Sequence, residues 1–380
     1  MKTQLFFLGL AIAVNHSIAQ TCSDGFESNS FAGWQGFTGT NAGNYSVTIT
    51  GTTISSPRFG IEGVSTSTII CSNSVNNPTV YQPLPANGFG QYSARLGEYN
   101  VTGMGVEILT YSFIPSASDT NFLFAYSTYL QAPSHSASDN PYFVIGILDA
   151  NGDTIPGSFY MYQTGTFSTL GFDTSACSSG LYFKPWTIRG VNLSSYAGQP
   201  VTLFAVNADC YYGGHYAYSY IDIDCDGVLN VPAVSNLVLN AKSEEGASYL
   251  WNTGATTPTI MIASPMPNTI YTCKVTLPAN YNNQVFYVNY QIMGTTNTEL
   301  SSYKTTINFI YPNPADDKLY LSSVKNFKLF NALGQVVRSI DNAEKMDVLD
   351  ITNLPEGVYF VQFTDLNSHV YFDKILIKRK

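Results

Sequence analysis

The sequence has 380 residues, with 17 Lys and Arg against 26 Asp and Glu, so its formal net charge at neutral pH is -9. This balance argues against a nucleic-acid-binding protein, because a phosphate-binding surface needs clustered Lys and Arg. Hydrophobic residues make up 44% and aromatic residues 14% of the chain, which excludes an intrinsically disordered protein and supplies apolar side chains for two or three domain cores.

The chain begins with the features of a secretory signal peptide. Lys2 supplies a positive charge, residues 5–14 form an apolar run, and residues 17–19 place small side chains at positions -3 and -1 of a cleavage site. We therefore predict a signal peptide over residues 1–19, the alternative being a buried N-terminal core segment. No later apolar run approaches ~18 residues, so no transmembrane segment is expected after cleavage.

Export makes disulfides the default state of the cysteines that follow the signal peptide. None of them stands in a C-x-x-C pair, which argues against a zinc knuckle or a thioredoxin-like site. Six cysteines allow fifteen connectivities, and the sequence does not choose among them. We predict a disulfide between Cys177 and Cys210, because they bracket two strand-like runs, and we expect Cys273 to stay unpaired. The other cysteines are Cys22, Cys71 and Cys225.

Residues 20–226 have the composition of a large β-domain. Short runs rich in Val, Ile, Tyr, Phe and Thr alternate with Gly, Pro, Asn and Ser, and no long stretch has helical periodicity. Asp-Ala-Asn-Gly at 149–152 is a hairpin turn signal, because Asn-Gly accepts positive φ readily. So many strands in one segment predict a two-sheet sandwich of the jelly-roll type. The predicted strands include 45–50, 105–113, 121–130, 142–148 and 201–205.

Short motifs in this segment resemble known modules. Phe26-Glu27 followed by Gly33-Trp34 is similar to the opening of MAM-like jelly-roll modules. Further stretches, in matching order and spacing, resemble a module of secreted Bacteroidetes surface proteins. These stretches are residues 92–97, 131–135 with 140–143, 183–186 and 208–222. The resemblance implies a jelly-roll fold and a surface-binding context, and it implies no reaction.

Residues 227–295 predict a smaller sandwich, with short strands at 238–239, 248–251, 259–262 and 271–275. The stretch 249–257 resembles the signature of Ig-like or PKD-like repeats in bacterial surface proteins. Trp251 on a strand and a Tyr two residues before Cys273 suit an Ig-like sandwich, although no earlier cysteine falls on the expected partner strand. The resemblance implies a spacer that holds a working domain away from an anchor.

A linker at 296–306 precedes the last segment, residues 307–380. Its blocks, which include 311–315, 318–321, 327–337, 349–361 and 374–380, resemble in this order the type A C-terminal sorting domain of the type IX secretion system. The resemblance implies a small β-sandwich that the secretion machinery recognises at the outer membrane, and a secreted or surface-attached protein. The alternative is a third Ig-like module without a targeting role. The motif residues are Tyr311, Pro312, Asn313, Pro314, Gly334, Gly357 and Tyr359.

A tyrosine-rich run carries the candidate ligand-binding residues. Tyr216, Tyr218, Tyr220 and Asp222 alternate along a predicted strand and therefore share one face. If exposed, this face would stack sugar rings, and the Asp222 carboxylate would accept hydrogen bonds from the sugar hydroxyls. The same face would equally well pack beneath another sheet, and the sequence leaves the two alternatives open.

The histidines belong to no recognisable catalytic motif. The chain has no G-x-S-x-G elbow and no H-E-x-x-H helix. His215 follows two glycines, where ligand contact competes with a structural hydrogen-bonding role. His135 lies in a Ser-rich loop, where contact with a ligand or ion competes with simple solvation.

Asp222, Asp224 and Asp226 form an acidic ladder that would line one face of a strand. Laminarinase-type glycoside hydrolases, which are also jelly rolls, use a similarly spaced set of acids. Their general acid and nucleophile are Glu, however, and three Asp depart from that pattern. D-x-D-x-D-G also begins like a calcium loop, but Ala233 stands where an EF-hand has its bidentate Glu. Two interpretations of these residues therefore remain. They form either a looser calcium site at Asp222 or Asp224, or a solvated strand face without a ligand.

The sequence thus predicts an all-β protein, a jelly-roll sandwich followed by two small Ig-like β-sandwiches. We expect a secreted or cell-surface, non-enzymatic binding or adhesion protein that is exported through the type IX secretion system. Its expected partners are the secretion machinery and a glycan or surface-protein ligand, with no nucleic acid and with calcium as the one candidate cofactor. The alternatives are a secreted carbohydrate hydrolase and a structural matrix component.

Overall fold

A computed structural model describes residues 22, 25–63, 86, 88–118, 121–163, 170–175 and 178–293, and in the C-terminal part residues 310–311, 315–321, 324–331, 335–343, 347–365 and 370–379. The chain forms two compact units, Met1–Glu299 and Leu300–Lys380. The predicted signal peptide and linker lie outside the described residues. Every regular element within the described residues is a β-strand or a short 3-10 turn, which confirms the all-β prediction. The 3-10 turns are η1 Ala137–Asp139, η3 Ser194–Tyr196 and η4 Ala279–Tyr281.

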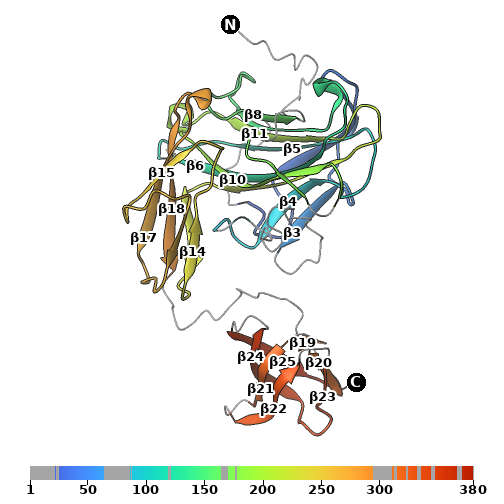
Figure 1. Ribbon diagram of the computed structural model, residues 1–380, viewed down its shortest axis with the longest axis vertical. Coiled ribbons are helices and arrows are strands. Elements are labelled where there is room, and N and C mark those ends of the chain that lie inside the picture. Colours follow the sequence, from blue (N-terminus) through green and yellow to red (C-terminus); the bar gives the residue numbers. More distant parts are fainter. Residues whose placement is uncertain are drawn as a thin grey trace. The chain divides into compact units, whose positions relative to one another are not determined.

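Two six-stranded antiparallel sheets form the first sandwich of the N-terminal unit (Figure 1). The first sheet consists of β1 Trp34–Asn41, β2 Val47–Gly51, β5 Gly105–Phe113, β7 Tyr142–Leu148, β8 Tyr160–Gln163 and β11 Val201–Ala208. The second consists of β3 Phe59–Gly63, β4 Tyr92–Gly97, β6 Phe122–Gln131, β9 Asp173–Thr174, β10 Leu181–Val191 and β12 Ala217–Asp224. Their orders are β2-β1-β5-β11-β7-β8 and β3-β4-β12-β6-β10-β9. The chain passes repeatedly between the sheets, as in the predicted jelly roll.

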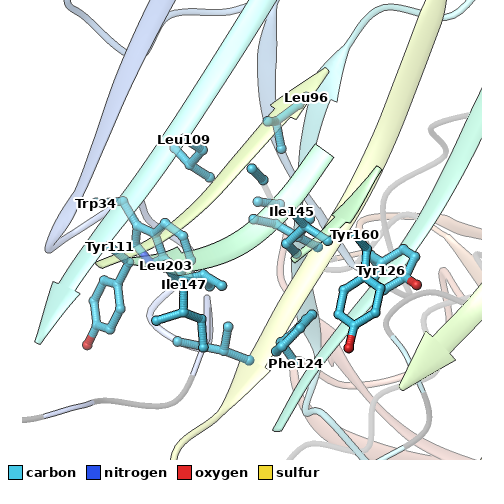
Figure 2. Close-up of a cluster of buried hydrophobic side chains, with 14 of the residues drawn as sticks. Trp34, Leu96, Leu109, Tyr111, Phe124, Tyr126, Ile145, Ile147, Tyr160 and Leu203 are labelled. Carbon is cyan, nitrogen blue, oxygen red and sulfur yellow. The ribbon is translucent and has the colours of Figure 1, made fainter. Parts of the chain in front are cut away.

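The inward side chains of both sheets meet in one hydrophobic core (Figure 2). The Trp34 ring lies 4.7 Å from the Phe26 ring and 4.8 Å from the Tyr111 ring, measured between centroids. Ile145 and Leu203 are fully buried in the same core. Full burial of such a side chain contributes about 1.5–3 kcal/mol to the stability of the fold, relative to leaving it exposed. Phe26 and Trp34, which carried the MAM-like resemblance, therefore serve the core of the sandwich.

A smaller sandwich follows in the same unit. Its strands are β13 Val228–Pro232, β14 Leu237–Asn240, β15 Ser248–Trp251, β16 Thr259–Ile262, β17 Ile270–Thr276 and β18 Val285–Met293. One sheet has the order β13-β18-β17-β15, with β13 parallel to β18, and the other pairs β14 with β16. Trp251 is buried, and its Nε1 donates to the Thr257 carbonyl at 2.8 Å. The predicted small sandwich is confirmed.

The two sandwiches share a second hydrophobic cluster. It includes Leu123, Trp186 and Tyr218 from the β6, β10 and β12 sheet, and Leu229, Trp251 and Tyr290 from the smaller sandwich. Asn121 Nδ2 donates to the Tyr287 carbonyl at 2.7 Å, and Gln284 Nε2 donates to the Gly190 carbonyl at 3.0 Å. The second sandwich therefore packs directly on the first, and its role as a spacer from an anchor stays a prediction. The sheet that contains β6, β10 and β12 is apolar on both faces, so the second sandwich covers the face that points away from the first core.

A buried ionic network crosses this contact. The carboxylate of Glu244, in the loop before β15, lies 3.1 Å from Lys184 Nζ and 3.4 Å from Arg189 Nη1. Tyr162 donates to Glu244 Oε1 at 2.6 Å, and Tyr126 donates to the same oxygen. Burial by itself raises the pKa of Glu244, but the two cations and the two hydroxyls outweigh it and hold this pKa below its ordinary value. One acid of the smaller sandwich thus pairs with two buried cations of β10.

The C-terminal unit is a small sandwich of its own. Its strands are β19 Ile310–Tyr311, β20 Lys318–Leu321, β21 Val324–Phe330, β22 Val336–Ala343, β23 Asp347–Asp350, β24 Gly357–Asp365 and β25 Val370–Ile377. They form sheets of the orders β19-β20-β23 and β22-β21-β24-β25. Leu319, Phe327, Val361 and Ile375 are buried between these sheets. This confirms the third β-sandwich that the sequence predicted.

Candidate functional site

The three tyrosines of the predicted sugar-stacking face are buried. Tyr216, Tyr218 and Tyr220 are at most 1% exposed. The Tyr218 ring stacks on that of Tyr129 with centroids 4.4 Å apart, and Ile221 of the opposite face enters the core between the two sheets. Because β12 is apolar on both faces, its tyrosine face packs into the cluster shared with the smaller sandwich. An exposed sugar-binding face at these residues is therefore wrong, and the packing alternative holds.

Replacing Tyr218 with alanine is expected to lower the free energy of unfolding by about 3–5 kcal/mol, because it leaves a cavity where a fully buried ring was stacked. Urea unfolding of the purified protein measures this loss. Tyr287→Ala is the matched control, since the Tyr287 side chain on β18 is 46% exposed, and its effect should stay within about 0.5 kcal/mol. Equal stability of the two variants would contradict the burial of Tyr218.

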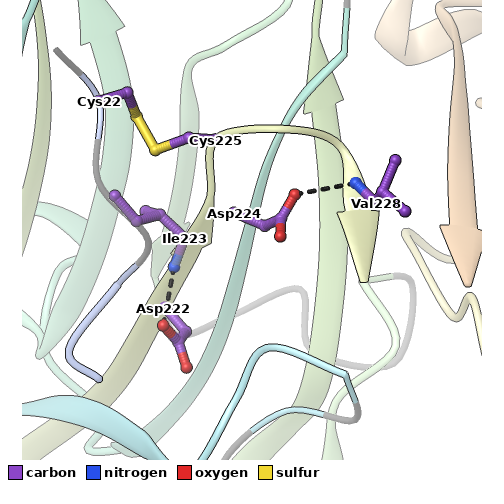
Figure 3. Close-up of a disulfide and its surroundings, with 6 residues drawn as sticks. All are labelled: Cys22, Asp222, Ile223, Asp224, Cys225 and Val228. Carbon is purple, nitrogen blue, oxygen red and sulfur yellow. Dashed lines mark hydrogen bonds between the residues drawn. A yellow bond between two sulfur atoms is a disulfide. The ribbon is translucent and has the colours of Figure 1, made fainter. Parts of the chain in front are cut away.

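Asp222 and Asp224 lie buried at the end of β12 beside a disulfide (Figure 3). Asp222 Oδ1 accepts from the Ile223 N–H at 2.9 Å, and Asp224 Oδ1 accepts from the Val228 N–H at 3.1 Å. Asp224 thereby closes the turn into β13, while Asp226 is exposed. The three acids do not form one solvated face, and calcium binding at the first two stays a prediction.

The cysteines pair differently from the prediction. Cys22 and Cys225, which are 203 residues apart, form a disulfide with a Cα–Cα distance of 5.8 Å. Cys210 is a buried free thiol, so the predicted disulfide between Cys177 and Cys210 is wrong for this structure. Cys177 itself lies outside the described residues. Cys273 is a free thiol as predicted, and burial raises its pKa to about 11.

The structure brings the two predicted histidines together. The ring centroids of His135 and His215 are 5.2 Å apart, and His215 Nδ1 lies 3.4 Å from Cys210 Sγ. Burial, and then the neighbouring His135, lowers the pKa of His215. From the sequence each histidine was an isolated candidate, because the β6–β7 and β11–β12 loops meet only through the order of the strands.

Two tyrosines beside these histidines form an exposed aromatic surface. Tyr211 is 36% exposed and Tyr212 is 63% exposed. Their ring centroids are 5.1 Å apart, and the Tyr212 ring lies 4.7 Å from that of His135. We refer to Tyr211, Tyr212 and His135 as the loop aromatic surface. In the sequence both tyrosines lie within the stretch 208–222 that resembles the surface-protein module, and neither is predicted as a site residue.

Hydrogen bonds between three loops hold the loop aromatic surface. The Tyr211 N–H donates to the Asp139 carbonyl at 2.9 Å, and the Asn44 N–H donates to Asp139 Oδ1 at 3.4 Å. Ser136 Oγ donates to the other carboxylate oxygen of Asp139. Gly43 has a φ of +79°, and a Cβ there would lie 3.3 Å from Asp139 Oδ1 and 3.5 Å from the Tyr211 ring. Glycine thus lets the β1–β2 turn approach the carboxylate and the ring closely.

Sequence reasoning missed two acids near the start of the β11–β12 loop. Asp209 accepts from the N–H groups of Ala217 at 2.8 Å and Gly105 at 3.2 Å, and burial raises its pKa to about 8. Glu107 forms an ion pair with Arg58 at 2.6 Å, and burial raises its pKa as well. The two bonds of Asp209 tie β5 to both ends of the loop. No local motif marks either acid, because the strand pairing brings their partners from distant parts of the chain.

Solved structures that are similar to this chain include two carbohydrate-binding modules and a glucuronidase, all of low identity. A carbohydrate-binding module in complex with β-1,4-galactotriose is 8% identical, with a TM-score of 0.26, over 52% of this chain and 90% of that chain. A carbohydrate-binding module that recognises mannan is 11% identical, with a TM-score of 0.26, over 53% and 95%. A β-glucuronidase from Ruminococcus gnavus is 10% identical, with a TM-score of 0.16, over 85% and 46%. No curated protein matched the chain.

The C-terminal motif residues that the structure describes serve the small sandwich. Tyr311 lies in β19, Gly357 begins β24 with a φ of +147°, and the buried Tyr359 hydroxyl donates to the Pro355 carbonyl at 2.9 Å. Pro312, Asn313, Pro314 and Gly334 lie outside the described residues.

Export is the part of the function that the comparisons establish. None of the helices in the described ranges is long and apolar enough to cross a membrane. Residues 309–378 match the family model of the secretion system C-terminal sorting domain. The chain therefore carries a type IX secretion sorting domain at its C-terminal end, and the protein is secreted or attached to the outer cell surface.

Proposed function

We propose that this protein is a non-enzymatic surface protein that binds glycans at its loop aromatic surface. The observation that carries the proposal is the Tyr212 side chain, which is 63% exposed while its ring contacts both Tyr211 and His135. A ring held by its neighbours loses little conformational entropy when a ligand covers it. Such a ring is already oriented for stacking.

The chemistry around Tyr212 suits a sugar. One face of a pyranose ring is apolar and would cover the tyrosine ring. This contact would stabilise the complex by about 25 cal/mol for each Å² of apolar area removed from water. The rim of the sugar carries hydroxyl groups. These can donate hydrogen bonds to the lone pairs of the Asp139 carboxylate that its protein partners leave unused. The net charge of -9 favours neutral over acidic glycans.

A glycan-array screen of the purified protein, followed by calorimetry on the best ligand, tests the proposal. Tyr212→Ala is expected to weaken binding by about tenfold or more, because it removes the central ring of the surface. Tyr287→Ala is the matched control and should bind as the parent does, since it removes an exposed tyrosine from the second sandwich. Unchanged unfolding of the Tyr212→Ala protein would show that the loss is one of binding.

The other outcomes separate the competing functions. Equal glycan binding by both variants would contradict a site at Tyr212. Absence of binding to every glycan would contradict the proposal and favour a surface-protein ligand or a structural matrix role. Release of shorter sugars during incubation would favour a hydrolase, and Asp209, whose pKa burial raises to about 8, would be the first residue to replace.

A further inference from the structure

Two histidines and a cysteine converge at one edge of the loop aromatic surface, to which His135 belongs. One ligand atom from each of His135, Cys210 and His215 lies within 4.8 Å of the other two. Among the residues that the structure describes, this is the one group of three His, Cys, Asp or Glu side chains that lie this close. Imidazole nitrogen and thiolate sulfur are the ligands that Zn²⁺ and related transition metals take in proteins.

We propose that His135, Cys210 and His215 bind a divalent transition metal, Zn²⁺ in the first place, with the fourth coordination position open to solvent. Tetrahedral Zn²⁺ with ordinary Zn–S and Zn–N bonds separates a sulfur ligand from a nitrogen ligand by about 3.5 Å. Cys210 Sγ and His215 Nδ1 are 3.4 Å apart, which fits this geometry without movement. The exposed His135 side chain closes the remaining distance by rotation.

The backbone prepares Cys210 and His215 as a pair of ligands. The Cys210 N–H donates to the His215 carbonyl at 3.2 Å, and the Gly213 N–H donates to the Cys210 carbonyl at 3.1 Å, so the loop closes on itself. Cys210 is buried, His215 is half-buried and His135 is exposed, which leaves the site open from the solvent side. A metal would take each histidine as a neutral imidazole, and its binding would displace the thiol proton of Cys210.

A metal at this position would join two loops that are far apart in the chain. His135 lies between β6 and β7, whereas Cys210 and His215 lie between β11 and β12. The metal would clamp these loops where Tyr212 contacts His135, and it would stabilise the folded state by mass action. The metal site goes beyond glycan binding: His135 belongs to both sites, but Tyr212, the ring proposed to stack on a sugar, is not a metal ligand.

Titration of the chelator-treated, full-length protein with Co²⁺ and then Zn²⁺ tests the site. Co²⁺ is expected to bind at one equivalent with a thiolate-to-metal charge-transfer band and tetrahedral d–d absorption, and Zn²⁺ should displace it. His135→Ala, which changes an exposed side chain, and His215→Ala should each weaken binding by more than tenfold. His369→Ala is the matched control, because this histidine lies within the residues that match the sorting domain, and it should leave the titration unchanged.

Two results would overturn the site. The first is a disulfide at Cys210 found by mass spectrometry of the non-reduced protein, since an oxidised sulfur cannot act as the thiolate ligand. The second is Co²⁺ binding that His135→Ala leaves unchanged. Tyr212→Ala is expected to retain full metal binding while losing glycan binding, so failure of the metal site and failure of the glycan site are told apart.

Discussion

Replacing Glu244 with alanine is expected to lower the free energy of unfolding of the N-terminal unit by about 3–5 kcal/mol. The Glu244 side chain is fully buried between Lys184 and Arg189, whose side chains are at most 2% exposed. Its removal leaves these buried cations without their anion, and leaves the hydroxyls of Tyr126 and Tyr162 without this acceptor. Urea unfolding followed by tryptophan fluorescence measures the loss.

The neighbouring residue provides the control. Glu245 has the same chemistry and lies one position along the same loop, but its side chain is exposed. Glu245→Ala should therefore change the free energy of unfolding by no more than about 0.5 kcal/mol. If Glu244→Ala proved as mild as Glu245→Ala, the buried network would not stabilise the contact between the two sandwiches.

The same carboxylate makes stability depend on pH. Burial raises the pKa of Glu244, but Lys184 and Arg189 outweigh it and hold the native pKa below the ordinary 4.5. The stabilisation is therefore complete above about pH 4.5 and is lost as the pH falls through the native pKa. The gap in unfolding free energy between the parent and Glu244→Gln should be widest at neutral pH and should shrink under acid. A constant gap down to about pH 3 would count against this linkage.

Removing the disulfide between Cys22 and Cys225 is expected to destabilise the N-terminal unit by about 4–5 kcal/mol. The bond joins residues 203 apart, so in the unfolded chain it closes a very long loop. The chain-entropy model assigns such a loop about 5 kcal/mol, at the upper end of the about 2–5 kcal/mol found when native disulfides are removed. Thermal and urea unfolding of the Cys22→Ser, Cys225→Ser double variant measure the change.

A buried cysteine without a disulfide provides the comparison for this change. Cys273 is a free thiol that is fully buried in the second sandwich. Cys273→Ser introduces a hydroxyl into an apolar site and should cost about 1–3 kcal/mol. If the double variant loses no more free energy of unfolding than Cys273→Ser does, closing the long loop with the disulfide contributes nothing to stability.

Local chemistry in the sequence was enough to predict most strands and turns. The strands predicted at 105–113 and 142–148 form with these bounds as β5 and β7. The predicted turn after β7 forms because Asp149 Oδ1 accepts from the Asn151 and Asp153 N–H groups at 2.8 and 3.0 Å, and because Gly152 takes a φ of +82°. Each of these features depends on residues a few positions apart, so a single stretch of chain contains all of its causes.

The sequence by itself determined the all-β class, the sorting domain and the route of export, because each rests on composition or on an ordered local motif. Only the tertiary structure decided which surface faces the solvent. Alternation along β12 told which side chains share a face, but the packing of the second sandwich buried Tyr218 and left Tyr212 exposed. The meeting of His135 with Cys210, and of Glu244 with Lys184, likewise depends on which strands become neighbours. Strand order joins residues far apart in the chain, and no local pattern records it.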